Sequence, residues 1–327
     1  MKKLCFIIPY FGKFNAYFPL FLKTCGWNKE FNWLILTDDR TPYDYPANVQ
    51  VTYLSFEALR QKIQSKFDFP IALERPYKLC DLKPMYGYLF EEYLYGYSFW
   101  GHCDVDTLMG NLHRWLTDEM LESYDKLFQL GHMTIYRNTE EMNRLFMKPH
   151  RGHLPYRKVL QNANSCWFDE EWNNDSNINR VFGDYGKRIY KEDLSLNISF
   201  NYNHFVRGRF VGVENTPMPF GFEIETQKDA LYLWEGGNLC RYYRENGALV
   251  REDFLYMHLQ QRPMKMHEEV LRLPSFQIIP DEFIPYAGGM VTEETFDRIP
   301  RPCRSRLRQR LWWKRVRTFM NKKIWKR

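Results

Sequence analysis

The 327-residue sequence lacks the motifs of three large enzyme classes. It has no G-x-x-x-x-G-K-[ST] phosphate loop, no G-x-G-x-x-G dinucleotide fingerprint and no G-x-S-x-G nucleophile elbow. These absences disfavour ATP hydrolysis, dinucleotide-dependent chemistry and α/β-hydrolase chemistry. No apolar run approaches the ~18–20 residues that span a bilayer. The short apolar run at residues 4–8 is therefore expected to be a buried strand and not a signal peptide.

The cysteines form no framework that the sequence reveals. There are seven, an odd number, and no two have C-x-x-C spacing. This pattern disfavours a set of disulfides and a zinc ribbon, and it favours a protein of the reducing cytosol.

Acidic residues are absent from residues 301–327, which hold twelve Lys and Arg residues. The whole chain has a formal net charge of +6, so residues 1–300 carry −6. A nucleic-acid-binding protein carries its basic patch within the fold, and this distribution therefore disfavours nucleic acid as a partner. It predicts one domain over residues 1–300 and a basic tail over residues 301–327.

The tail has apolar residues at helical spacing between its basic residues. Trp312 and Val316, for example, are four positions apart, as are Val316 and Met320. A basic amphipathic helix with Trp suits the headgroup layer of an anionic membrane. We expect a cytoplasmic protein that is peripheral to the inner face of the cell membrane. Docking of the helix on the body of the protein, or on a partner, is the alternative.

The apolar pattern of residues 1–300 predicts alternating strands and helices, which is typical of an α/β fold. Strands are predicted at residues 4–8, 32–37, 49–54, 97–103, 132–137, 231–234, 239–243 and 254–258. Helices are predicted at residues 15–26, 56–67, 84–94 and 138–146.

A D-x-D pair, Asp104 and Asp106, follows the strand predicted at residues 97–103. Alternate positions of an extended chain point the same way, so both carboxylates can converge on one ion. Oxygen ligands suit Mg²⁺ or Mn²⁺, which can bridge the phosphates of a nucleoside diphosphate. The alternative is an exposed turn with a capping Asp.

Basic residues precede the helix predicted at residues 84–94. Lys78 and Lys83 flank Asp81, and Pro84 suits the first turn of the helix. Such a position can bind a diphosphate or a nucleotide. A capped helix start with solvated lysines is the alternative.

Three further segments contain candidate functional residues. His258 ends a predicted strand and is a candidate third metal ligand, with Arg262 placed to reach a phosphate. Asp169 and Glu170 lie in an acidic run and are candidates for a general base. Asp38 and Asp39 end a predicted strand, where ligands bind in open α/β sheets. A structural histidine, a solvated acidic patch and a turn are the respective alternatives.

Taken in order, these segments resemble glycosyltransferases of the GT-A type. The resemblance is closest to little-characterised bacterial transferases of capsule, O-antigen and lipopolysaccharide synthesis. It is carried by residues 6–12, 33–39, 77–84, 100–106, 131–138 and 256–264. It implies a Rossmann-like mixed sheet flanked by helices.

The resemblance also implies roles for individual residues. Pro9, Tyr10 and Asp39 are expected near the nucleoside of a sugar nucleotide, and Lys78, Asp81 and Lys83 by the donor. Residues 131–138 are expected to line the floor under the donor sugar and the acceptor. Asp104, Asp106 and His258 are expected to hold Mn²⁺ or Mg²⁺, and Asp169 or Glu170 to take the acceptor's proton.

The sequence therefore predicts a metal-dependent glycosyltransferase. Its partners are a nucleotide-sugar donor, for which we expect a UDP-sugar, and a glycan or lipid-linked acceptor. Two alternatives stay open: a nucleotidyltransferase that uses the same acidic pair, and an inactive scaffold that its basic tail recruits to membranes or RNA. The donor sugar, the linkage, the stereochemistry and the oligomeric state are not determined by the sequence.

Overall fold

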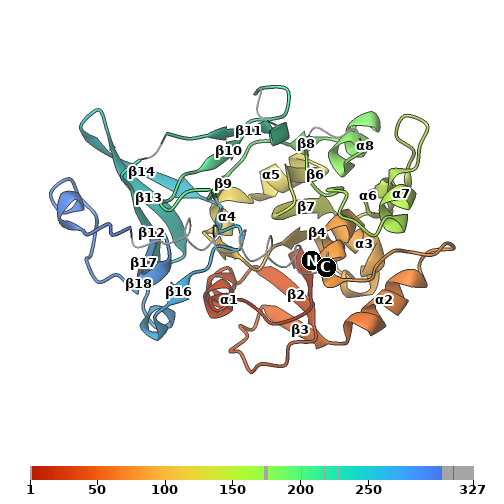
Figure 1. Cartoon of the computed structure of the whole chain (residues 1–327), viewed down its shortest axis with the longest axis horizontal. Helices are drawn as coiled ribbons and strands as arrows, with labels where there is room; N and C mark the ends of the chain where they lie inside the picture. Colours follow the sequence, from red (N-terminus) through yellow and green to blue (C-terminus); the bar gives the residue numbers. More distant parts are fainter. Residues whose placement is uncertain are drawn as a thin grey trace, which may run out of the picture.

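The computed structural model describes residues 2–172, 176–199, 201–216, 219–226, 228–303 and 312. Its centre is a seven-stranded sheet with the order β3-β2-β1-β4-β7-β6-β8 (Figure 1). β3, β2, β1 and β4 are parallel, whereas β7 is antiparallel to β4 and β6. The strands are β1 (Lys2–Tyr10), β2 (Phe31–Thr37), β3 (Val49–Tyr53), β4 (Tyr97–Cys103), β6 (Lys126–Leu130), β7 (Met133–Arg137) and β8 (Ile189–Tyr190).

The inner strands of this sheet are apolar because both of its faces are covered. In β1, Leu4 and Phe6 are buried in one hydrophobic cluster, and Cys5 and Ile7 in another. Strands buried on both faces are continuous apolar runs, which explains why residues 4–8 and 32–37 were predictable as strands. The predicted α/β fold, a mixed sheet flanked by helices, is confirmed.

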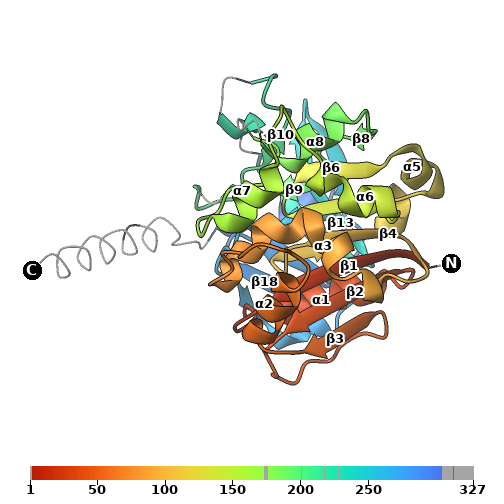
Figure 2. The same cartoon turned by 90° about the vertical axis from the view of Figure 1, so that its right-hand side faces the viewer.

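Helices cover both faces of the sheet. One face packs against α2 (Phe56–Gln64), α3 (Tyr86–Leu89), α6 (Glu140–Arg144), α7 (Pro155–Gln161) and α8 (Ile178–Asp184), which lie on the right in Figure 1 and face the viewer in Figure 2. The other face packs against α1 (Phe18–Trp27), α4 (Leu112–Trp115) and α5 (Asp118–Ser123). Each helix is short, so its stability comes from the apolar face that it buries.

A second sheet of six strands lies on the other side of α1, on the left in Figure 1. Tyr17 and Leu20, at the start of α1, share a hydrophobic cluster with Trp234 and Phe276 of this sheet. In the order of the sheet, its strands are β14 (Ala248–Phe254), β13 (Asn238–Glu245), β12 (Leu231–Glu235), β17 (Ser275–Ile279), β18 (Glu282–Pro285) and β16 (Lys265–Met266).

A small three-stranded sheet joins these two parts of the molecule. It consists of β5 (Thr107–Met109), β15 (Tyr256–His258) and β9 (Ser195–Asn197), with β15 in the middle. His258 is paired with Thr107 on one side and with Asn197 on the other. The sheet therefore places the end of β15 directly beside the loop that follows β4.

The helix predicted at residues 84–94 differs in the structure. It is a 3₁₀ helix, η1 (Pro76–Met85), followed by the short α3 and by a second 3₁₀ turn, η2 (Glu91–Tyr93). The break lies at Phe90, whose φ of −125° and ψ of 27° are not helical and which separates α3 from η2. The segment is therefore broken where the sequence predicted one helix.

Most of the predicted basic tail lies outside the described residues, because only residues 301–303 and 312 of it are described. Its helical character, and the domain boundary between residues 300 and 301, stay predictions. Among the described residues, no helix has the length and hydropathy needed to span a membrane.

A close contact between α3 and β4 gives a test of the packing. Trp100 donates its indole N–H to Asn143 Oδ1 over 2.7 Å, and both atoms lie against Gly87. A Cβ at Gly87 would lie 2.3 Å from Trp100 Nε1. We expect Gly87→Ala to lower the free energy of unfolding by about 1–3 kcal/mol in urea titrations.

Gly183→Ala in α8 is the matched control, since a Cβ there meets nothing within 4 Å. Because Ala has the higher helix propensity, no loss of stability is expected for the control. Equal stability of the two variants would contradict this account of the packing.

Candidate active site

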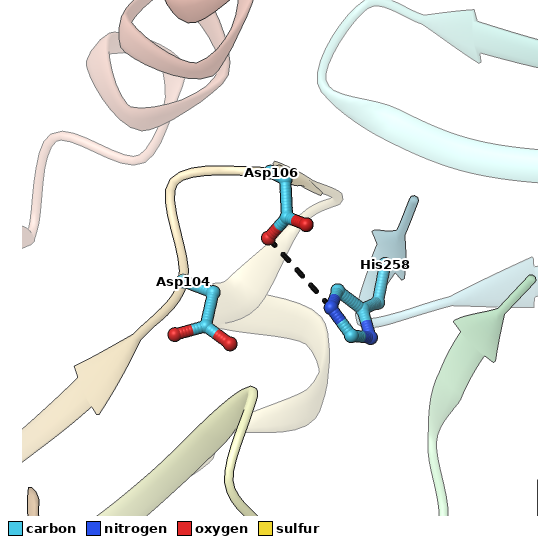
Figure 3. Close-up of side chains that lie close together, drawn as sticks. All are labelled: Asp104, Asp106 and His258. Atoms are coloured by element: carbon cyan, nitrogen blue, oxygen red, sulfur yellow. Dashed lines mark ion pairs between the residues drawn. The ribbon is translucent and has the colours of Figure 1, made fainter. Parts of the chain in front are cut away.

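The D-x-D carboxylates and His258 meet at the carboxyl end of β4. Asp104 and Asp106 lie in the loop between β4 and β5, and His258 reaches them from β15 (Figure 3). One ligand atom from each of the three residues lies within 4.8 Å of the others. Asp106 Oδ1 and His258 Nε2 are 3.6 Å apart. Residues 104 and 258 are far apart in sequence, and the pairing of β5 with β15 brings them together.

A partner on the neighbouring strand orients His258. Its Nδ1 is 3.0 Å from Asn197 Oδ1, which also accepts a hydrogen bond from Gln260 Nε2 at 2.9 Å. Because Asn197 Oδ1 is an acceptor, it favours the tautomer with the proton on Nδ1. His258 Nε2 then has a free lone pair toward the carboxylates, as a metal-binding histidine requires.

A strained turn orients Asp106. Gln260 and Gln261 both have a positive φ, of 50° and 55°, which is uncommon for residues other than Gly. This turn aims the backbone N–H of Gln261 at Asp106 Oδ2, 2.5 Å away. Oδ2 is therefore occupied, while Oδ1 faces His258. Such strain persists where the surrounding structure enforces it, and it is common at functional sites.

The chemistry of this donor set fits a divalent cation. Two carboxylates and one imidazole are suitable ligands for Mn²⁺ or Mg²⁺. Burial raises the pKa of Asp106, and the neighbouring Asp104 raises it further. Two carboxylates so close together in a buried site need a positive partner, and a bound cation would provide one.

Lys83 connects this cluster to a second pair of carboxylates. Its Nζ lies 2.8 Å from Asp104 Oδ1, 2.8 Å from the backbone oxygen of Gly131 and 3.5 Å from Asp169 Oδ2. Burial opposes its charge, but Asp104 and Asp169 hold the pKa of Lys83 well above its usual value. Lys83 is therefore a buried cation shared by two predicted site residues.

The side-chain carboxylates of Asp169 and Glu170 lie against the backbone of Gly131. A Cβ at Gly131 would lie 2.3 Å from Asp169 Oδ2 and 2.7 Å from Glu170 Oε1, so a larger residue there would displace these carboxylates. Burial raises the pKa of both carboxyls, against the attraction of Lys83. Glu170 also interacts electrostatically with Asp104 and His258. The neighbouring Glu171 instead pairs with Arg180 at 2.6 Å.

Lys78 and Asp81, which were predicted to lie by the donor, lie in the interior, where Asp81 interacts electrostatically with Asp169; their place by a donor stays a prediction. Both are buried and form an ion pair of 2.8 Å. Lys78 also donates to the backbone oxygen of Asn164, and Asp81 accepts from the N–H groups of Cys166 and Phe168. The pair fixes the segment that leads into Asp169 and Glu170, so its role is structural.

Arg262 is likewise placed away from the predicted phosphate contact. It is buried, and its guanidinium donates to the backbone oxygens of Ser199, Tyr202 and Pro280. The positive φ angles of Gln260 and Gln261 turn the chain before Arg262, so the strand direction at His258 does not continue to it.

Pro9, Tyr10, Asp38 and Asp39 lie at the carboxyl ends of β1 and β2, beside the cluster. Burial raises the pKa of Tyr10, and the charges of Asp106 and Asp39 raise it further. Asp38 accepts from the N–H of Gly12 at 2.8 Å. Asp39 is buried and paired with Lys13 at 2.6 Å. Pro9, the residue before Tyr10, pairs with Leu36 of β2.

Three residues at the cluster were not predicted as site residues. Asn197 orients His258, and nothing in its sequence surroundings indicates this. His132 stacks on His258 with ring centroids 4.3 Å apart, and its Nδ1 lies 2.6 Å from the Tyr256 hydroxyl. Burial raises the pKa of Tyr17, and the charge of Asp106 raises it further; the Tyr17 hydroxyl is buried without a hydrogen-bond partner among the described residues. His132 falls within residues 131–138, for which only the floor of the site was predicted.

The buried pair of Lys78 and Asp81 gives a test of this geometry. Lys78→Met leaves the Asp81 carboxylate buried without its cation, which typically costs about 3–5 kcal/mol. We expect that loss in urea titrations of the purified variant. Lys265→Met is the matched control, because the Lys265–Glu282 pair is exposed on the lysine side and is worth at most about 1 kcal/mol. Similar losses in both variants would refute a structural role for Lys78.

Comparisons with known proteins give a family and distant structural likenesses. No curated protein matches the chain. The galactosyltransferase LgtC, in complex with donor and acceptor sugar analogues, has a TM-score of 0.33 at 10% identity. That match covers 60% of this chain and 75% of LgtC. An active-site mutant of LgtC has the same TM-score and identity, over 60% of this chain and 74% of the mutant. At this distance the likeness carries no argument about activity.

One family model matches residues 6–287, which include every strand of both large sheets except the first residues of β1. The matched range also contains all thirteen residues predicted for the site. The chain therefore belongs to a family of unknown function, DUF6625.

Proposed function

We propose that the protein is a glycosyltransferase of the GT-A type that uses a nucleotide-sugar donor and a divalent metal ion. One observation carries the proposal. Asp104, Asp106 and His258 converge within 4.8 Å at the end of β4, and Lys83 connects them to the buried Asp169 beside Glu170. A three-ligand cation site next to a second pair of carboxylates suits the transfer of a group from a diphosphate to a hydroxyl.

The donor side of the site is assigned to the D-x-D cluster. Asp104, Asp106 and His258 would hold Mn²⁺ or Mg²⁺, which would neutralise the diphosphate of the donor. Ligands of open α/β sheets bind beyond the carboxyl ends of the strands, where Pro9, Tyr10, Asp38 and Asp39 lie. We assign the nucleoside to these residues. Lys83 would turn its charge toward the phosphates when a cation takes over Asp104.

The acceptor side is assigned to Glu170. In the transfer step the acceptor oxygen forms a bond to the anomeric carbon, and the bond from that carbon to the diphosphate breaks. The electron pair leaves with the diphosphate, and the proton of the acceptor hydroxyl passes to a carboxylate if the configuration inverts. Glu170 suits this role because its pKa is raised by burial. Asp169 is held by Lys83 and positions the segment.

The acceptor is proposed to be a glycan or a lipid-linked saccharide of bacterial surface polysaccharide synthesis. This choice of acceptor rests on the resemblance of the sequence to such transferases. The basic residues of the tail would bring the enzyme to an anionic membrane that carries a lipid-linked acceptor.

The metal cluster gives the first test of this function. We expect Asp106→Asn to lower sugar transfer at least about 100-fold, because it removes a charge that the cation needs. The assay incubates purified protein with Mn²⁺, a panel of nucleotide sugars and a panel of glycans, and detects products by mass spectrometry. Asp118→Asn is the matched control, since its side chain is 83% exposed and pairs with Lys3 near the amino end of β1, whereas the site lies at the carboxyl ends of the strands.

Transfer by Asp106→Asn at the wild-type rate, with Mn²⁺ present, would refute the metal-site assignment. Turnover of nucleoside triphosphates without sugar transfer would instead favour a nucleotidyltransferase.

The hydrogen bond between Asn197 and His258 gives a second test. We expect Asn197→Ala to weaken Mn²⁺ binding about 10–100-fold, because partners of this kind fix the orientation and tautomer of a metal-binding histidine. Isothermal titration with Mn²⁺ measures this effect without any substrate. Asn215→Ala, an exposed asparagine elsewhere, is the control and should bind as the wild type does. Unchanged affinity in Asn197→Ala would show that His258 is not a ligand held in this way.

A further inference from the structure

Three aromatic side chains form a cluster at the surface, and two of them are close in sequence to Asp169 and Glu170. Trp167 and Trp172 meet edge to face, with ring centroids 4.9 Å apart and an angle of 62°. Trp172 in turn stacks on Phe220, at 5.4 Å and 19°. We call Trp167, Trp172 and Phe220 the aromatic platform. The mechanism above does not use it.

The aromatic platform is exposed and is held in a strained backbone conformation. Trp167 is 47% exposed and Phe220 is 46% exposed, although large aromatic rings usually lie inside a protein. Trp167 has φ of 51° and Phe220 has φ of 76°, which are outliers for bulky residues. Exposed apolar clusters and strain of this kind are both typical of ligand-binding surfaces.

The aromatic platform is fixed to the carboxylates of the site. Trp167 and Trp172 stand on either side of residues 168–171, and buried Asp81 holds the N–H groups of Cys166 and Phe168. Phe220 arrives from η4 (Pro219–Gly221), directly before β11 (Phe222–Ile224). Figure 1 shows β11 at the upper edge and the nucleoside-side strands β2 and β3 at the lower edge, with β4 between them. The two sides of the site are therefore separate.

We propose that the aromatic platform is the acceptor subsite and that it binds the apolar face of a pyranose ring. The assignment rests on the proposed function, because it places the acceptor beside Glu170. A sugar ring offers a face of C–H groups to an aromatic ring and hydroxyl groups around its edge. The carboxylates of Asp169 and Glu170, which lie between Trp167 and Trp172 in the sequence, can accept hydrogen bonds from such hydroxyl groups.

The surroundings favour a sugar over an acyl chain or a nucleobase. An acyl chain would bury the neighbouring carboxylates without giving them a partner, which is unfavourable. A nucleobase belongs to the donor, whose proposed place is at β1 and β2. A carbohydrate satisfies both the aromatic faces and the polar groups between them.

Saturation-transfer NMR tests this assignment without metal or donor. The probes are the methyl glycosides of glucose, galactose, mannose and N-acetylglucosamine, with uridine and hexanoate as comparisons. We expect at least one glycoside to receive saturation at its ring protons from the wild type. Trp172→Ala and Phe220→Ala should each weaken its binding about tenfold, the scale of losing one ring from a stacking platform. Trp172→Phe should keep most of it.

Trp27→Ala is the matched control, because Trp27 is 49% exposed and lies outside the aromatic platform. Its binding should equal that of the wild type. The proposal is overturned if no glycoside binds, or if Trp172→Ala and Phe220→Ala both bind normally. Saturation of uridine or hexanoate that depends on Trp172 would also overturn it.

The outcome is separable from that of the proposed function. Glycoside binding that persists in Asp106→Asn, while the wild type transfers no sugar, would refute the transferase and leave the aromatic platform as a carbohydrate site. Sugar transfer by a protein whose Trp172→Ala and Phe220→Ala variants use the acceptor normally would refute the aromatic platform alone.

Discussion

The ammonium group of Lys83 is the contact on which the candidate site depends. It joins Asp104 of the D-x-D pair, the backbone at Gly131 and the buried Asp169, with distances of 2.8, 2.8 and 3.5 Å. Without it, several buried carboxylates would repel one another in a poorly solvated place. The rest of the site is built around this arrangement. Gly131 gives room to the carboxylates, and the Lys78–Asp81 pair fixes the segment that carries Asp169 and Glu170.

Strained backbone conformations also occur around the candidate site. Gln260 and Gln261 adopt positive φ angles after His258, and Trp167 does so two residues before Asp169. Neither conformation is favourable for these side chains. Each places a group where the site needs it: a backbone N–H on Asp106, and an exposed indole beside the carboxylates. Because the surrounding fold enforces these unfavourable conformations, the polar groups are in place before a ligand binds. Electrostatic stabilisation of a transition state depends on such preorganisation.

Local patterns were enough to predict part of the fold and of the site. The strand before Asp104 has the apolar residues Phe99, Trp100 and Cys103, which are buried, so its end and the D-x-D pair could be located. Lys78 and Lys83 are alike in sequence, whereas only burial and partners distinguish the structural lysine from the one at the site. Arg262 was misplaced because a turn with positive φ angles interrupts the strand direction. The positions of Asn197 and Phe220 depend on contacts between segments that are distant in sequence, and no local sequence pattern predicts such contacts.

The central claim is that Asp104, Asp106 and His258 bind a divalent cation together with a nucleoside diphosphate. Crystals of the full chain grown with Mn²⁺ and UDP test it directly, through the anomalous scattering of manganese. The account predicts one strong peak within about 2.0–2.3 Å of a carboxylate oxygen from each Asp and of His258 Nε2, with the diphosphate completing the coordination. Bound UDP with no manganese peak at these residues, or manganese bound elsewhere in the chain, would contradict it.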